Sequence, residues 1–178
     1  MSTLIKRSDV ALQDTWCLED IFTTDDLVKE GMKEARALLD SFKVYEGKLT
    51  SSAEVLYEAL QKSDEASKLV EKIYVYSHMR LHQDGGNSFY QDLSSQSEKL
   101  LVDFQTALSF VNPELSTLTE TDVEKLIASY EPLKLYKRSL EEVLRQKEHI
   151  LDAKMEDVLS QFREIATAPS NTYAMFNN

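Results

Sequence analysis

Residues that interrupt helices are scarce in this 178-residue chain, which has four glycines and three prolines. It contains neither a glycine-rich phosphate-binding loop nor a G-x-S-x-G nucleophile motif. A single cysteine, Cys17, excludes a disulfide within the chain. No apolar run approaches the roughly 20 residues that a membrane-spanning helix needs. The sequence therefore predicts no membrane partner and none of the enzyme classes that depend on those two motifs.

Positive charge is scarce as well, with 20 lysines and arginines against 31 aspartates and glutamates and a net charge of −11. No local cluster of basic residues compensates, and so much negative charge repels phosphate backbones. We therefore predict no nucleic-acid partner. The chain starts without a secretory signal, which together with the lone cysteine predicts a cytoplasmic location. A content of 42% hydrophobic and 29% charged residues is typical of a globular protein.

Long stretches rich in Lys, Glu, Leu and Ala lie between the few breakers and predict an all-α fold. Apolar residues recur every three or four positions in successive segments, which is the pattern of helices with one buried face. We expect a bundle of about six to seven antiparallel helices with short loops over residues 25–178. A short irregular arm, residues 1–24, precedes it, and we expect its large side chains to dock on the bundle.

Capping and turn residues predict where the first helices begin and end. Ser51 followed by Glu54 forms a capping box, and Ser63-Asp64 gives a second start signal. Gly85-Gly86 ends that second helix, and Asn112-Pro113 closes the next one. The loop after Asn112-Pro113 would divide the bundle into two sub-lobes, residues 25–112 and 119–168.

Similar signals predict the remaining helices. Thr119 or Thr121 opens a short helix, Pro132 suits the first position of another, and Asp152 can cap a long one. A further helix starts at Pro169-Ser170 and has just begun an apolar pattern when the chain stops at Asn178. We therefore expect that the chain was cut from a longer protein.

Two histidines on one predicted helix form the most conspicuous candidate metal site. His78 and His82 lie four residues apart, which places both imidazoles on one helix face. The zinc motif H-E-x-x-H uses this spacing but has a catalytic glutamate after the first histidine, where this chain has Met79. A third ligand is also required, and only Asp84 lies nearby. We expect a structural or surface role for the pair, with no bound metal.

Other residue types that could carry chemistry have simpler interpretations. Cys17 has no histidine nearby in the sequence, and Glu19 and Asp20 would raise its pKa, so we expect a small buried hydrophobic residue. The acidic pairs Asp25-Asp26 and Glu141-Glu142 are typical of helix starts and solvated faces. His149 stands near a predicted helix end as a cap or surface residue. We predict no catalytic, cofactor-binding or metal-binding residue in the chain.

Six segments in order along the chain carry a family resemblance. They are W-C-L-E-D-I-F at 16–22, Y-E-G-K-L at 45–49, K-I-Y-V-Y-S-H-M-R at 72–80, F-V-N-P-E-L at 110–115, R-Q-K-E-H-I-L at 145–151 and N-N at 177–178. Together they resemble the amino-terminal helical region of oligoendopeptidase F, a family of bacterial zinc oligopeptidases of the thimet oligopeptidase type. The chain departs from that family in lacking its H-E-x-x-H helix, which lies downstream of the resembling region.

The resemblance implies a mostly helical, two-lobed hydrolase that encloses a deep channel and cleaves short peptides. In that family, two histidines of H-E-x-x-H and a later glutamate hold one zinc ion. This chain would supply helices of the channel-walling lobe, with the catalytic lobe as its partner and zinc only in the full-length enzyme. The isolated chain would then be inactive and could form a homodimer through the uncovered lobe interface.

Two other function classes remain open from the sequence. The chain could be a free-standing helical adaptor whose grooves bind partner helices, in which case its apolar stripes should exceed what its own core requires. It could also be a small metal-binding regulator that uses His78 and His82.

Overall fold

The computed structural model describes residues 9–147, 169, 172 and 173, and this part of the chain contains helices and no strand. Its α-helices are α1 (Asp25–Asp40), α2 (Ala53–Gln83), α3 (Ser88–Ala107), α4 (Val111–Leu115), α5 (Glu120–Ser129) and α6 (Lys137–Gln146). Short 3-10 helices are η2 (Leu12–Asp14), η3 (Leu18–Asp20), η4 (Ser41–Val44) and η5 (Glu131–Tyr136). The predicted all-α class is confirmed. Within these ranges, no helix is both long and apolar enough to cross a membrane.

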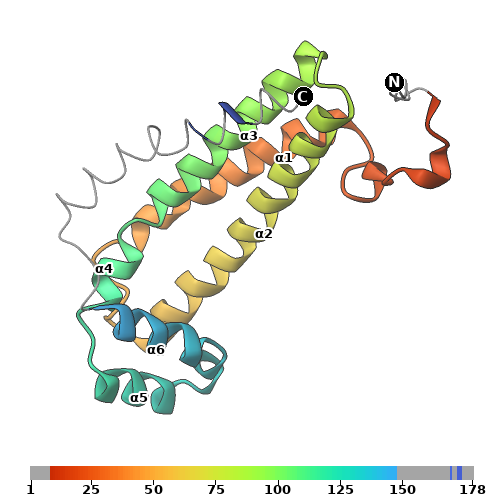
Figure 1. The fold of residues 1–178 in the computed structure, drawn as a ribbon. Helices are drawn as coiled ribbons and strands as arrows, with labels where there is room; N and C mark the ends of the chain where they lie inside the picture. The colour runs from red at the N-terminus through yellow and green to blue at the C-terminus, as the bar shows by residue number, and fades with distance from the viewer. Residues whose placement is uncertain (1–8, 148–168, 170–171, 174–178) are drawn as a thin grey trace.

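The three long helices α1, α2 and α3 pack side by side, and α2 and α3 form a hairpin (Figure 1). Helices α4, α5 and α6 gather at the end of this layer where α2 begins, while the amino-terminal arm lies at the opposite end (Figure 1). Elements α5, η5 and α6 contact one another, and both α5 and η5 also contact α2. The long helix predicted from Asp152 lies outside the described residues, so the predicted helix number and the two sub-lobes stay predictions.

Helix α1 shows how local signals place an element. The Thr24 side chain accepts a hydrogen bond from the backbone N–H of Leu27, and Asp25 and Asp26 occupy the first turn, where the helix dipole favours negative charge. Apolar residues at three- and four-residue intervals are buried, as predicted. After η4, the chain reverses through a turn in which Gly47 has φ +74°, a conformation that favours glycine.

Helix α2 differs from the prediction because one helix replaces two. Its N-cap is Ser52, whose side chain accepts from Val55 N–H at 3.2 Å, so the start predicted at Ser51 was wrong by one residue. Ser63-Asp64, read as a second start, lies in the helix interior. A serine and an aspartate cost a helix only a few tenths of a kcal/mol each relative to good helix formers, and buried neighbours such as Ala59 and Ala66 offset that cost.

The end of α3 also differs. The helix begins at Ser88, with the Asn87 side chain accepting from Phe89 N–H, but it ends at Ala107 instead of running to Asn112-Pro113. Asn112 and Pro113 lie inside the short helix α4, where proline is tolerated because first-turn N–H groups have no helical acceptor. The Thr119 prediction is confirmed, since Thr119 and Asp122 form a reciprocal capping box.

The arm is only partly docked. Leu18 is buried, and the Phe22 ring packs edge-on against Tyr76 with centroids 5.5 Å apart. Trp16, however, is 80% exposed and Leu12 is 87% exposed. The prediction that the large side chains of the arm dock on the bundle is therefore correct for Leu18 and Phe22 and wrong for Trp16.

Tyrosine–carboxylate hydrogen bonds connect segments that lie far apart in the sequence. The Tyr45 hydroxyl donates to Glu58 at 2.8 Å, and the Tyr136 hydroxyl donates to Asp64 at 2.7 Å. Burial, together with the bond to Glu58, raises the pKa of Tyr45 to about 12. Burial and the bond to Asp64 raise the pKa of Tyr136 as well. Both bonds require a protonated phenol.

These shifts predict a specific loss of stability in alkali. Because the pKa of each folded phenol lies above its unfolded value of about 10, its stabilising contribution is complete below pH 10 and is lost as pH rises through the folded pKa. At pH 7, the variants Tyr45→Phe and Tyr136→Phe should each lose about 1 kcal/mol of unfolding free energy. For Tyr45→Phe, that difference from the parent chain should narrow between pH 10 and pH 12 and disappear or reverse by pH 12.

Urea titrations at pH 7, 9, 11 and 12 measure this effect. The matched control is Tyr74→Phe, which removes a hydroxyl that makes neither of these two bonds. Equal destabilisation by Tyr45→Phe at every pH would contradict the prediction.

Candidate functional site

His78 is fully engaged in structural contacts. Its side chain is 20% exposed, and its ring stacks on Tyr74 at a centroid distance of 3.9 Å. Nδ1 lies 3.0 Å from the backbone oxygen of Tyr74, while Nε2 lies 3.2 Å from Glu98 Oε1 and 3.3 Å from Ser94 Oγ. Because both ring nitrogens have protein partners, His78 acts as a connection between α2 and α3.

His82 lies one turn later on α2 and is exposed. The described residues contain no group of three or more His, Cys, Asp or Glu side chains arranged to hold a metal ion. Although Glu98 contacts His78, no third side chain among the described residues completes a metal site with both histidines, and Asp84 does not supply one. That His78 and His82 bind no metal stays a prediction. His149 lies outside the described residues.

Cys17 is exposed, so its predicted burial was wrong. The reason is local, because η3 turns the neighbouring Leu18 inward and leaves Cys17 at the outer side of the arm. A hydrogen bond with the Asp20 carboxylate, slight burial and the charge of Asp20 raise the pKa of the Cys17 thiol. A thiol with a raised pKa is a poor nucleophile.

The acidic pairs serve as predicted for helix starts and solvated faces. Asp26 pairs with Lys29 at 3.3 Å at the start of α1. Glu142 pairs with Arg145 at 2.6 Å on an exposed face of α6, and the hydrogen bonds from Arg145 and Gln146 lower the pKa of Glu142 to about 2. Asp26 and Glu142 each contact a cation of their own helix, an arrangement that does not serve acid–base catalysis.

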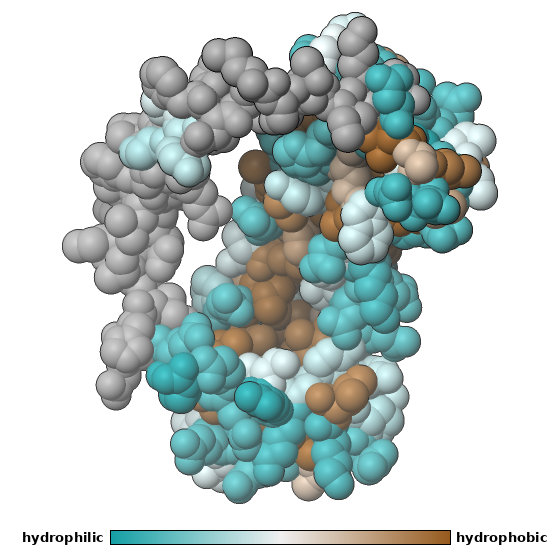
Figure 2. Space-filling view, turned by 45° about the vertical axis from the view of Figure 1, so that its right-hand side comes forward, coloured by the Kyte–Doolittle hydropathy of each residue, from teal (hydrophilic) through white to brown (hydrophobic). Residues whose placement is uncertain are grey.

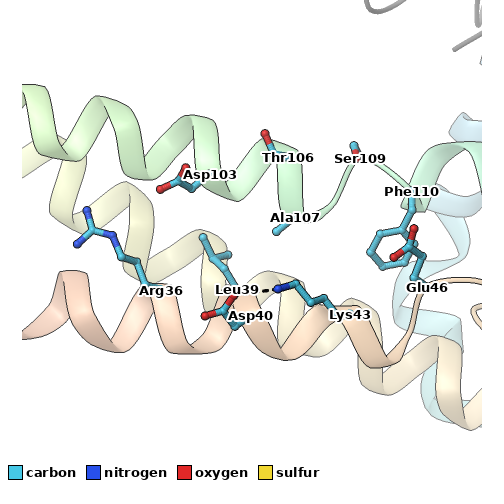
Figure 3. Close-up of a pocket in the computed structure, with 10 residues that line it drawn as sticks. All are labelled: Arg36, Leu39, Asp40, Lys43, Glu46, Asp103, Thr106, Ala107, Ser109 and Phe110. Atoms are coloured by element: carbon cyan, nitrogen blue, oxygen red, sulfur yellow. Dashed lines mark hydrogen bonds and ion pairs between the residues drawn. The ribbon is translucent and has the colours of Figure 1, made fainter. Parts of the chain in front are cut away.

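A groove of about 430 Å³ lies between α1 and α3, near the end of the layer where α3 stops (Figure 3). Its lining combines apolar and charged side chains: Arg36, Leu39, Asp40, Lys43, Glu46, Asp103, Thr106, Ala107, Ser109 and Phe110. The Arg36 side chain of α1 and the Asp103 side chain of α3 extend into the space between the two helices (Figure 3). Lys43 pairs with Asp40 at 3.4 Å. Charges of both signs suit a small polar or zwitterionic group, and the lining holds no histidine or cysteine.

Arg80 forms a second cluster that the sequence did not single out. Its guanidinium donates to the Tyr76 hydroxyl at 3.0 Å, to Glu19 at 2.9 Å and to Gln83 at 3.2 Å. Tyr76 in turn donates to Asp25 at 2.8 Å. Burial alone would lower the pKa of Arg80, but the bonds to Tyr76 and Glu19 outweigh it and raise the pKa. The cluster thereby connects the arm, α1 and α2.

Comparison with known proteins gives these features a context. Residues 114–178 match the family model described as Oligopeptidase F. The chain is 37% identical to Oligopeptidase PepF of Bacillus subtilis (strain 168), and the match covers 97% of this chain. This chain belongs to the oligoendopeptidase F family. It corresponds to the amino-terminal part of those enzymes.

Further relatives agree with this assignment. An oligoendopeptidase F homolog of Lactococcus lactis subsp. lactis is 32% identical over 97% of this chain. The crystal structure of oligoendopeptidase-F from Enterococcus faecium superimposes with a TM-score of 0.76 and 27% identity over 86% of this chain. The chain spans only 26% of Bacillus subtilis PepF, 29% of the Lactococcus homolog and 30% of the Enterococcus chain. The predicted family resemblance is confirmed.

Proposed function

We propose that this chain forms the amino-terminal, channel-walling lobe of a cytoplasmic zinc oligoendopeptidase that hydrolyses short peptides. The observation that carries this proposal is the 37% identity to Oligopeptidase PepF across nearly the whole chain. The all-helical architecture fits the role, because packed helices form a rigid wall that limits entry by size. Closure of such a wall over a site also excludes water from it.

The chemistry would reside in another part of the polypeptide. H-E-x-x-H is absent from the 178 residues, His78 has protein partners on both ring nitrogens, and the groove between α1 and α3 holds no histidine or cysteine. Among the described residues, none of these side chains is arranged to hold a zinc ion. We assign its residues to binding and packing, and we assign zinc to the catalytic lobe of the full-length enzyme.

That catalytic lobe is the proposed principal partner. Figure 2 shows one face on which apolar side chains gather in a hollow bordered by polar ones, as expected where one lobe meets another. Tyr173, one of the few described residues near the carboxyl end, is 72% exposed. Met175 and Phe176 lie outside the described residues. Without the catalytic lobe, such surfaces favour self-association, and we propose that the isolated chain can form a homodimer.

A chimera tests the proposal. This chain would replace the corresponding amino-terminal region of Bacillus subtilis PepF, and hydrolysis of a quenched fluorescent peptide would be measured. We expect the chimera to cleave the peptide in a zinc-dependent manner, while the 178-residue chain alone gives no cleavage above background. The control is PepF with that region deleted, which should lose activity.

Two outcomes would contradict the proposal. The first is a folded chimera that binds zinc stoichiometrically and cleaves nothing. The second is a deletion variant as active as the chimera, because the region would then be dispensable for peptide hydrolysis.

A free-standing helical adaptor is the alternative function. Exposed apolar side chains such as Val44, Val102 and Leu135 belong to three different elements, and single exposed apolar residues are normal on proteins in water. The family membership favours the peptidase lobe over the adaptor. An inactive chimera together with a monomeric, stable isolated chain would favour the adaptor.

A further inference from the structure

The arm displays the chain's only tryptophan to solvent. Trp16 is 80% exposed and Leu12, four residues earlier in the sequence, is 87% exposed. Scattered exposed leucines are normal, but a tryptophan has a large apolar ring that is on average highly buried. Tryptophan is also the residue type most enriched among the anchors of protein interfaces. This part of the arm is therefore a candidate docking surface, which we call the Leu12–Trp16 edge.

The edge is held in place and not loosely attached. Two residues after Trp16, Leu18 is 1% exposed within the core, and Glu19 pairs with Arg80 at 2.9 Å. Within the edge, the Thr15 hydroxyl donates to the backbone oxygen of Leu12 at 2.8 Å. A surface ordered in advance loses less conformational freedom when it binds. The arm thus presents its two large apolar side chains in a defined conformation.

The charge around the edge restricts the chemistry of a partner. From Leu12 to Asp20 the sequence carries Asp14, Glu19 and Asp20 and no lysine or arginine, and Glu19 is already paired with Arg80. Complementary potentials are what distinguish a correct partner from other apolar surfaces. A protein that accepts Trp16 and Leu12 should therefore surround its apolar pocket with basic side chains. The whole chain has a net charge of −11, so two copies repel each other and are poorly suited to pair through this edge.

We propose that the Leu12–Trp16 edge docks into a basic-rimmed apolar pocket on the catalytic lobe of the oligoendopeptidase polypeptide. The proposal rests on the proposed function, since the catalytic lobe is the partner that function requires. The relatives are three to four times as long as this chain, which covers 26% of one and 30% of another. Most of their length can therefore supply the pocket. The arm lies at the end of the long helices away from α4–α6, where a second lobe can reach it (Figure 1).

The sequence makes the edge easy to observe, because the only tryptophan and the only cysteine are neighbours. The chain would be produced with 5-fluorotryptophan, so that Trp16 gives one fluorine resonance. Cys17, which is exposed, would be labelled with a maleimide, and the rate of this labelling reaction would be measured. The partner is the separately produced remainder of Bacillus subtilis PepF, with serine in place of any cysteine. The same Cys17 labelling would be repeated in the chimera, where the two parts are covalently joined.

Docking should shift the Trp16 resonance and slow Cys17 labelling by about tenfold or more, in the mixture and in the chimera. Trp16→Ala and Leu12→Ala should each weaken the association at least about tenfold. The matched control is Leu135→Ala, which removes another exposed leucine, 75% exposed, at the other end of the molecule and should change nothing. In the isolated chain, Trp16→Ala should leave the melting temperature unchanged.

The outcomes separate this inference from the proposed function. If the chimera is active but its Cys17 is labelled as fast as in the isolated chain, the docking proposal is wrong. The proposed peptidase function is then unaffected. Slow labelling of Cys17 in a chimera that cleaves no peptide would support docking of the Leu12–Trp16 edge and would contradict the proposed peptidase function. A Trp16 shift that depends on the concentration of this chain alone, or on added short peptide, overturns the proposal in favour of a second copy or a substrate.

Discussion

Replacing Arg80 with methionine should lower the free energy of unfolding by about 3 kcal/mol. Methionine keeps most of the aliphatic length of the side chain but removes the charge and all guanidinium donors. The side chain of Arg80 is only 17% exposed and that of Asp25 is 31% exposed, so water replaces only part of the lost interactions. Glu19 and Asp25 would lose their neighbouring cation, and the Tyr76 hydroxyl would lose one donor while keeping its own bond to Asp25.

The size of the effect follows from what Arg80 connects. Glu19 belongs to the arm, Asp25 begins α1, and Tyr76 belongs to α2. Arg80 donates to Glu19 and Tyr76 directly and lies 3.8 Å from Asp25, and its guanidinium also lies 6.0 Å from the centre of the Tyr90 ring. Charge-assisted hydrogen bonds in partly buried sites are stronger than exposed ion pairs. One side chain thus holds the arm to two helices.

Lys29→Met is the matched control, because Lys29 also pairs with an aspartate in the first turn of α1. Its pair with Asp26 is exposed on both sides, so the change should cost less than about 0.5 kcal/mol. Arg80→Lys should recover only part of the loss, since an ammonium group cannot reach three acceptors with the planar fork of arginine. Urea unfolding of the three variants measures the series. If Arg80→Met and Lys29→Met lower the free energy of unfolding equally, the Arg80 cluster stabilises the fold no more than an exposed ion pair does.

Hydrogen exchange adds a local readout of the same substitution. The backbone N–H groups of Ile21 and Phe22 both donate to the Leu18 oxygen in the native arm. If Arg80 holds the arm, these two amides should exchange faster in Arg80→Met under conditions where α2 remains protected. Because Leu18 and Glu19 fix the Leu12–Trp16 edge, the same variant should also weaken any docking through Trp16.

The features that the sequence predicted correctly are those with local causes. The buried face of α1 follows from apolar spacing, and the Thr119 capping box follows from two residues three positions apart. The end of α2 before Gly85-Gly86 follows from two glycines that favour a break in a helix. In each case the signal and the structure lie within a few residues of each other.

The features that were missed depend on contacts between distant segments. Arg80 and Glu19 are separated by 61 positions, and no spacing rule connects them. The groove between α1 and α3 forms because Arg36 and Asp103 come to face the same space only after the helices pack (Figure 3). The exposure of Trp16 contradicts its hydrophobicity, which composition alone would place in the core. Such misses occur where tertiary contacts or function override local preference.

A proline at position 63 should cost about 3 kcal/mol or more, because Ser63 lies in the interior of the continuous helix α2. Proline there removes the backbone hydrogen bond to the preceding turn, and its ring collides with the carbonyl of Ala59. The sequence alone placed a helix start at Ser63-Asp64, and a proline beside a helix start would be tolerated. The substitution therefore distinguishes one long helix from two short ones. Urea unfolding gives the magnitude directly.

A series at the same position supplies the control, since alanine and glycine rank differently in the two arrangements. Inside a helix, Ser63→Ala should be neutral or slightly stabilising, while Ser63→Gly should cost up to about 0.5 kcal/mol. At an N-cap the order would invert, because alanine there costs about 1 kcal/mol and glycine only a few tenths. We expect the interior order, with stability falling from alanine through serine and glycine to proline. The inverted order, with proline tolerated, would mean that α2 breaks at Ser63 and that the layer formed by α1, α2 and α3 is interrupted near its centre.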